Sequence, residues 1–78
     1  MANTLKITVN RRRFDARHGV KPAMTAAELA ELIDIPARNA IVEREGDNNE
    51  LFSVPSDAPI DIEPGMHFLV TRHFVMGG

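Results

Sequence analysis

The sequence closes on two glycines, Gly77 and Gly78, and this pair is the feature best suited to do chemistry. Glycine has no Cβ, so it lets backbone pass a narrow channel and adopt conformations that other residues avoid. At the terminal position it also leaves an activated carbonyl carbon open to attack by a thiol or an amine. We therefore expect the carboxylate of Gly78 to be the reactive group. If Gly78 is the native end, no processing precedes activation; the alternative is a frayed end without a role.

Side chains typical of a catalytic centre are scarce in the rest of the sequence. It contains no cysteine, and its two serines, Ser53 and Ser56, lie in or beside a proline-rich stretch without a Gly-x-Ser-x-Gly elbow. The carboxylates Asp57, Asp61 and Glu63 flank turns, where capping and solvation account for them. No glycine-rich phosphate loop is present. We predict that the protein is not an enzyme and binds no cofactor.

The three histidines raise the question of a metal site. His67 and His73 are six residues apart, so on an extended strand they would lie about 20 Å from each other. Ligands that share one ion each need a nitrogen about 2 Å from it. His18 could join only one of the two. We expect exposed histidines and no metal site.

Size and composition restrict the classes of protein that fit. Seventy-eight residues suffice for one domain, and the absence of cysteine favours the reducing cytoplasm over secretion. The N-terminus is no signal peptide, and apolar runs such as 68–70 are far too short to span a membrane. A net charge of −2 offers no general positive surface for nucleic acid. We expect neither nucleic acid nor a membrane as a partner.

Two segments near the N-terminus, residues 4–10 and 13–17, alternate apolar and polar side chains, the period of a half-buried strand. The side chains expected to face inward are Leu5, Ile7, Val9, Phe14 and Ala16. Two such runs this close predict an antiparallel hairpin that ends at Gly19. The basic cluster at residues 11–13 lies between them. We interpret it as a solvated turn, with phosphate or partner binding as the alternative.

The segment Thr25-Ala26-Ala27-Glu28 fits the capping-box pattern for the start of a helix. Met24 and Leu29 could pack across this cap as a hydrophobic staple. Apolar residues then recur at helical spacing, and Pro36 disfavours helix at the residue before it. We predict a helix of about ten residues that ends near Asp34, with its apolar stripe on a sheet.

The remaining segments predict further strands. A strand is expected at 40–44, a short apolar segment at 51–54, and a last strand at 66–72, preceded by a type II turn at Pro64-Gly65. The predicted order is hairpin, helix, strand, short strand, loop and final strand. It indicates an α+β fold, with one helix packed on one face of a mixed sheet of four to five strands.

This order of elements, in under 80 residues ending in Gly-Gly, resembles the ubiquitin family. The segments most similar to bacterial ubiquitin-like proteins described as multiubiquitin domains are Ile7 to Asn10 with the arginines after it, Met24 to Leu29, Asn39 to Val42, and Glu63 to Phe68. The resemblance implies a β-grasp domain over residues 1–72 and a flexible C-terminal tail over residues 73–78.

What the resemblance implies about function is a protein modifier. An activating enzyme would use ATP to adenylate Gly78 and would then hold it as a thioester. A conjugating enzyme would pass it to amines of target proteins, and a deconjugating protease would remove it. Such bacterial modifiers look to be encoded beside these enzymes, in some cases in antiviral defence operons.

The tail departs from that of ubiquitin, which has arginines before its Gly-Gly. Here Phe74, Val75 and Met76 precede the glycines, which suggests an activating enzyme with an apolar channel that also contacts Arg72. Alternatively, Phe74 and Val75 only lengthen the last strand. Six residues after Arg72 span about 20 Å when extended, enough to enter a deep cleft. Leu69, on the outer face of the last strand, is a candidate partner contact.

Two other functions stay open. A sulfur carrier resembles a modifier in its fold, its Gly-Gly end and its adenylating partner, but its terminus becomes a thiocarboxylate. A plain interaction domain with an inert tail is the third possibility.

Overall fold

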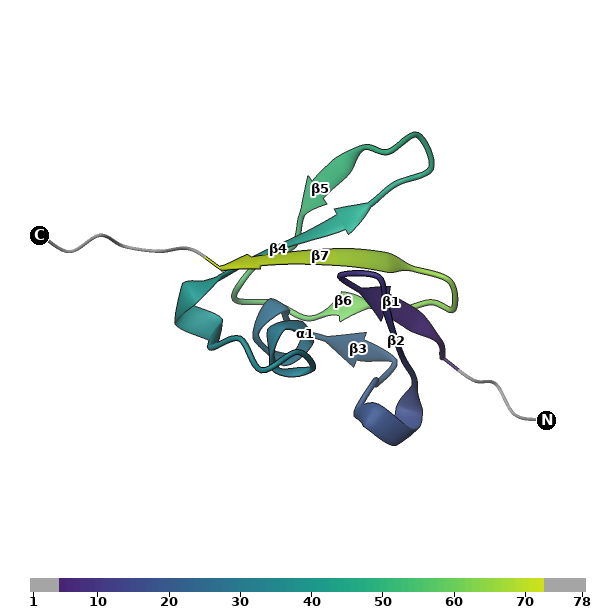
Figure 1. Ribbon diagram of the computed structural model, residues 1–78, viewed down its shortest axis with the longest axis horizontal. Coiled ribbons are helices and arrows are strands. Elements are labelled where there is room, and N and C mark those ends of the chain that lie inside the picture. Colours follow the sequence, from purple (N-terminus) through teal and green to yellow (C-terminus); the bar gives the residue numbers. More distant parts are fainter. Residues whose placement is uncertain (1–4, 73–78) are drawn as a thin grey trace, which may run out of the picture.

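The computed structural model describes residues 5–72, and these form an α+β fold (Figure 1). The strands of the main sheet are β1 (Ile7–Val9), β2 (Arg12–Phe14), β4 (Ala40–Glu45), β5 (Leu51–Ser53) and β7 (His67–Arg72). They lie in the order β2-β1-β7-β4-β5, with β7 parallel to β1 and antiparallel to β4. Helix α1 (Ala26–Glu31) packs on one face. This mixed five-stranded sheet with one helix is β-grasp-like and confirms the predicted fold class.

A second, smaller sheet was missed in the sequence. Strands β3 (Ala23–Met24) and β6 (Ile60–Asp61) are two residues each and pair antiparallel. Two short 3₁₀ helices, η1 (Ala16–His18) and η2 (Ala37–Asn39), were also missed. Elements this short span too few residues to reveal a hydrophobic period.

The core lies between α1 and the main sheet. Its buried apolar side chains are Ile7, Val9, Phe14, Val20, Met24, Ala26, Leu29, Ala30, Val42, Ile62, Phe68 and Val70. Residues from both ends of the described chain meet here, because β1 and β7 are adjacent in the sheet. Among residues 5–72 no polar or charged residue is buried, so the domain is stabilised by packing rather than by interior ion pairs.

The first hairpin forms, but it is shorter than predicted, and Arg12 and Arg13 of the predicted basic turn lie on β2 instead. Asn10 and Arg11 make its two-residue turn, and both have positive φ, 53° and 68°, as the tight turn between twisted strands requires. The prediction that Ala16 faces inward on a strand is wrong. Ala16 is exposed in η1, because the Asp15 side chain accepts a hydrogen bond from the Arg17 N–H and caps that helix.

The predicted capping box is confirmed at the start of α1. The Thr25 hydroxyl accepts from the Glu28 N–H at 3.2 Å, and the Glu28 carboxylate accepts from the Thr25 N–H at 2.9 Å. Met24 and Leu29, the residues of the predicted staple, are both buried.

Helix α1 ends earlier than predicted, at Glu31, and a turn follows it to Asp34. Asp34 has a φ of 61°, and the N–H groups of Asp34 and Ile35 donate to the carbonyls of Glu31 and Ala30. This left-handed cap ends the helix upstream of Pro36, so the proline is not what terminates it. No helix of the described residues is long and apolar enough to cross a membrane.

Candidate functional site at the end of strand β7

Strand β7 is the element that leads toward the predicted reactive terminus. It lies in the middle of the sheet, with β1 on one side and β4 on the other. Phe68 and Val70 are buried, and Leu69 between them faces the opposite side of the sheet. Met66, predicted to begin this strand, lies in the turn before it and is partly buried against the core. The alternation predicted for the strand is otherwise confirmed.

The turn that begins β7 has the predicted type II geometry. Gly65 has a φ of 90°, and the Met66 N–H donates to the Glu63 carbonyl. The Gly65 N–H donates to the Lys6 carbonyl at 2.8 Å, which ties the turn to the segment before β1. The start of β7 is therefore closed by its own turn and held to the β1 side of the sheet.

A side-chain amide secures β7 further along. Asn10 is the first residue after β1, yet it continues the pairing of β1 with β7. Its carbonyl oxygen accepts from the Val70 N–H at 2.7 Å, and its amino group donates to the Val70 carbonyl at 3.0 Å. These bonds hold β7 two residues before Arg72.

Arg72 is the last described residue, and it is exposed. Its register partner on β4 is Ala40, which directly follows η2. Figure 1 shows η2 beside the end of β7. The exposed Arg38 of η2 therefore belongs to the same end of the molecule as Arg72. Two cationic side chains thus lie at the end of the sheet from which the chain continues.

The other residues predicted to do chemistry or to contact an activating enzyme lie outside the described residues. They are Phe74, Val75, Met76, Gly77 and Gly78. Their predicted roles remain predictions.

The outer face of the sheet, opposite α1, contains Leu69 as predicted. Leu69 lies opposite Glu43 on β4 and is half-buried, not freely exposed. Ile41, whose partner is Thr71, lies diagonally from Leu69 on the same face and is 45% exposed. The sequence did not predict the exposure of Ile41, because the apolar residues at the start of residues 40–44 indicate a strand but not which of its faces is buried.

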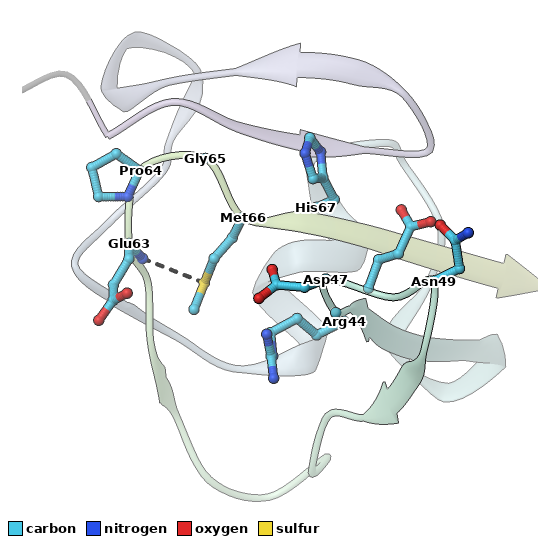
Figure 2. Close-up of a pocket in the computed structure, with 10 residues that line it drawn as sticks. Arg44, Asp47, Asn49, Glu63, Pro64, Gly65, Met66 and His67 are labelled. Carbon is cyan, nitrogen blue, oxygen red and sulfur yellow. Dashed lines mark hydrogen bonds between the residues drawn. The ribbon is translucent and has the colours of Figure 1, made fainter.

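A polar hollow of about 590 Å³ lies at the opposite end of β7 from Arg72 (Figure 2). It is formed by the turn between β4 and β5 and the turn before β7. Among its lining side chains, Arg44 faces a mainly acidic set that includes Asp47 and Glu63, and His67 forms one wall. The Glu63 N–H donates to the Met66 sulfur at 3.4 Å. This hollow is remote from the predicted reactive end.

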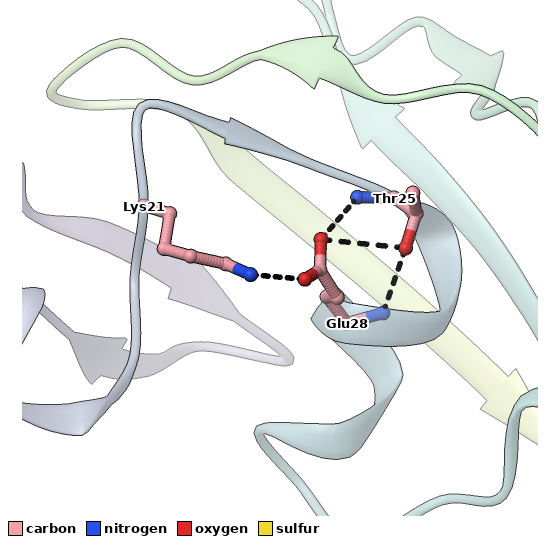
Figure 3. Close-up of polar contacts among 3 residues, drawn as sticks. All are labelled: Lys21, Thr25 and Glu28. Atoms are coloured by element: carbon pink, nitrogen blue, oxygen red, sulfur yellow. Dashed lines mark hydrogen bonds and ion pairs between the residues drawn. The ribbon is translucent and has the colours of Figure 1, made fainter.

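Two carboxylates of the described chain have shifted pKa values. The hydrogen bond from Lys21 and then that from the Thr25 N–H lower the pKa of Glu28 (Figure 3). Burial alone would raise the pKa of Asp15, but hydrogen bonds from the Arg17 backbone and from His18 outweigh it and lower the pKa. Both carboxylates are therefore structural caps of helices, ionised over the whole physiological range.

The side chains of the two described histidines each lie within hydrogen-bond distance of one neighbouring side chain. The His67 Nδ1 lies 2.6 Å from the Thr8 hydroxyl across the β1–β7 pair, and the His18 Nδ1 lies 3.0 Å from Asp15. In the part of the chain that the structure describes, no three His, Asp or Glu residues are grouped so that they could hold a metal ion. His73 lies outside the described residues.

Comparisons of this sequence with protein-family models, curated proteins and solved structures find no match. The resemblance to ubiquitin-like proteins therefore stays a prediction from the residues.

Proposed function

We propose that this chain is a ubiquitin-like protein modifier. The carboxylate of Gly78 is adenylated by a separate ATP-using enzyme, captured as a thioester and transferred to amines of target proteins. The observation that supports the proposal most is the position of β7. The strand that leads to Gly77 and Gly78 is the central strand of a β-grasp-like sheet, anchored on both sides up to Val70.

The chemistry explains why such an anchor matters. A modifier must present its terminus to three or more enzymes in turn, and each needs the body of the modifier in a defined position. A rigid strand fixes the point where the last residues leave the body, and this reduces the entropy lost when an enzyme binds them. The anchor at Val70 and the pair Ala40–Arg72 supply that fixed point.

Arg72 supports a specific contact in this scheme. It is exposed at the end of the anchored strand, six positions before Gly78. Any enzyme that takes the terminal residues into its nucleotide site approaches this end first. We propose that Arg72 contacts the activating enzyme, together with Phe74, Val75 and Met76 in its channel, while Leu69 contributes to a receptor surface.

The proposal is tested by incubating the chain, tagged at its N-terminus, with an extract of its native cells and ATP. Denaturing gels and intact mass follow its fate. We expect high-mass adducts that require ATP and disappear when Gly78 is deleted. Arg72→Ala should slow their formation, and Arg17→Ala, at an exposed arginine in η1, is the matched control that should not.

Two outcomes would contradict the proposal. A mass gain equal to the replacement of one oxygen by sulfur, without adducts, would identify a sulfur carrier. Adduct formation that is unchanged by deletion of Gly78 would show that the terminus is not the reactive group.

A further inference from the structure

The charges of this chain are segregated along its sequence. Six of its nine Lys and Arg residues lie within the first 21 residues, where Asp15 is the single carboxylate. The other ten of the eleven Asp and Glu residues follow. The net charge of −2 is therefore the sum of a strongly basic N-terminal segment and a strongly acidic segment that follows it.

The fold places part of each segment at opposite edges of the main sheet. Strand β2 is one edge, and Arg12 and Arg13 on it are both exposed, with Arg11 exposed in the turn before it. Strand β5 is the other edge. It is preceded by the exposed Glu50 and paired with β4, which contributes Glu43 and Glu45 on the outer face and one cation, Arg44, on the helix side, so carboxylates prevail there. The sheet thus has a basic edge, β2, and an acidic edge, β4–β5.

Both edges have backbone groups available for a further strand. Among residues 5–72 no strand pairs with the outer side of β2 or of β5. Such an edge is a template for pairing with another chain. All three residues of β5 are exposed, and the apolar Leu51 and Phe52 are 49% and 44% exposed. Figure 1 shows the β4–β5 hairpin extending away from α1, so the helix does not cover this edge.

Strand direction allows the two edges to pair with each other. Strand β2 is antiparallel to β1, β1 is parallel to β7, and β4 reverses direction between β7 and β5. It follows that β2 and β5 run in opposite directions. When a second copy is placed beside the first in the same orientation, its β2 meets β5 as an antiparallel strand, and both helices stay on the same side.

The side chains are compatible with that pairing. Arg12 lies opposite the buried Val9, so it is on the helix side of the sheet, and Phe52 is on that side because its partner Arg44 lies opposite the buried Phe68. A register with Arg12 opposite Phe52 therefore keeps every side chain on its own face.

In that register Arg13 lies opposite Leu51, whose partner on β4 is Glu45. Leu51 would then be covered between an arginine and a glutamate. Arg44 stacks over Phe52 with its guanidinium carbon 4.9 Å from the ring centroid, and Arg12 lies over Phe14 in the same way at 5.5 Å, so each guanidinium is held by a ring of its own chain.

Charge also selects against the alternatives. Two β2 edges would bring arginines directly opposite arginines. Strand β5 itself bears no charge, and two β5 edges would only bring Glu50 and the carboxylates of β4 closer to their counterparts. Like charges directly opposite on paired strands are destabilising. Unlike edges attract each other, so the favoured contact is head-to-tail, which adds further copies until it closes into a ring or continues as an open chain.

We propose that a second copy of this chain docks its basic β2 edge on the acidic β5 edge of the first, so that successive copies form one continuous sheet. Strand β7 is in the centre of each sheet, so this contact leaves the end of β7 at Arg72 uncovered. The proposal does not depend on the function proposed for Gly78.

Sedimentation velocity of the full chain over a concentration series tests this. At low salt we expect the weight-average mass at least to double as concentration rises, and at high salt to return toward the monomer, because exposed charges are screened. The double variants Arg12→Gln/Arg13→Gln and Glu43→Gln/Glu45→Gln each remove one charged edge and should stay monomeric. In a mixture, the arginine variant retains the acidic edge and the glutamate variant retains the basic edge. These two edges can pair once, so the mixture should form a dimer and nothing larger.

Two controls keep the test specific. Glu31→Gln/Asp34→Asn alters charge on and after α1, away from both edges, and should assemble like the unmodified chain. Deletion of Gly78 should also leave assembly unchanged. Circular dichroism and denaturant unfolding must show that the edge variants are folded. A monomer at every concentration, assembly that survives in both edge variants, or a mixture that forms no dimer would each overturn the proposal.

Discussion

The side-chain amide of Asn10 forms both backbone hydrogen bonds of Val70, a residue 60 positions away in the chain. It takes the place of the next backbone pair in the β1–β7 ladder, at the point where β1 has already turned away toward β2. The same residue has a φ of 53°, a conformation that asparagine tolerates better than most residues. One side chain thus serves both the hairpin turn and the central strand.

Replacing Asn10 separates these two roles. Asn10→Gly keeps the backbone freedom for positive φ but removes both hydrogen bonds, so we expect the free energy of unfolding to fall by about 1–3 kcal/mol. Asn10→Ala adds strain in the turn and should be less stable still. Denaturant unfolding measures stability, and hydrogen exchange at the Val70 amide reports the lost bond. Unchanged exchange at Val70 in both variants would contradict this account.

The capping box predicts a local effect at α1. Thr25→Ala removes the acceptor for the Glu28 N–H and should lower stability by about 1 kcal/mol. Thr25→Ser retains that acceptor and is the matched control. Equal stabilities for the alanine and serine variants would show that the cap contributes nothing.

The lowered pKa of Glu28 predicts a pH dependence. A carboxylate whose pKa is lowered in the folded state stabilises the protein fully above its unfolded-state pKa, here near 4.5, and loses this contribution as pH falls through the folded-state pKa. Glu28→Gln should therefore be less stable than the unmodified chain at neutral pH, and the difference should shrink in acid. Urea unfolding across a pH series measures it. A difference that stays constant with pH would contradict the assigned cause.

Gly65 predicts a purely conformational effect. A Cβ built at this position meets nothing within 4 Å, but its φ of 90° strains any L-residue. Gly65→Ala should lower the free energy of unfolding by about 1–2 kcal/mol without any clash. Gly65→Asn should lower it less, because asparagine tolerates positive φ. Thermal unfolding compares the two, and an alanine variant as stable as the unmodified chain would refute the claim of strain.

The sequence predicted those elements whose signals are local. Alternation at Ile7 and Val9, the Thr25–Glu28 box and the Pro64-Gly65 turn all reappear in the structure. The signals at Asp15 and Asp34 were misjudged for a different reason. Asp15 caps η1, and Asp34 adopts a positive φ, so both change the direction of the backbone. Neither effect produces a periodic pattern of apolar residues that could be recognised in the sequence.

Features that depend on long-range strand pairing could not be predicted from the sequence. The bond between Asn10 and Val70, the pairing of β3 with β6, and the exposed Phe52 at the sheet edge follow from strand order, which no local pattern encodes. The candidate site divides in the same way. Arg72 and Leu69 were placed on the correct strand, whereas the anchor that positions them was not foreseen.

The central claim is that Gly78 becomes bonded to amines of other proteins, and peptide mapping of adducts tests it most directly. Trypsin cleaves after Arg72, and no Lys or Arg follows it, so a conjugated target must retain residues 73–78 on its modified amine. The account predicts target peptides whose lysine bears this six-residue branch, found with ATP and missing when Gly78 is deleted. Adducts joined through any other residue, or tryptic peptides that end freely at Gly78 in every high-mass band, would contradict it.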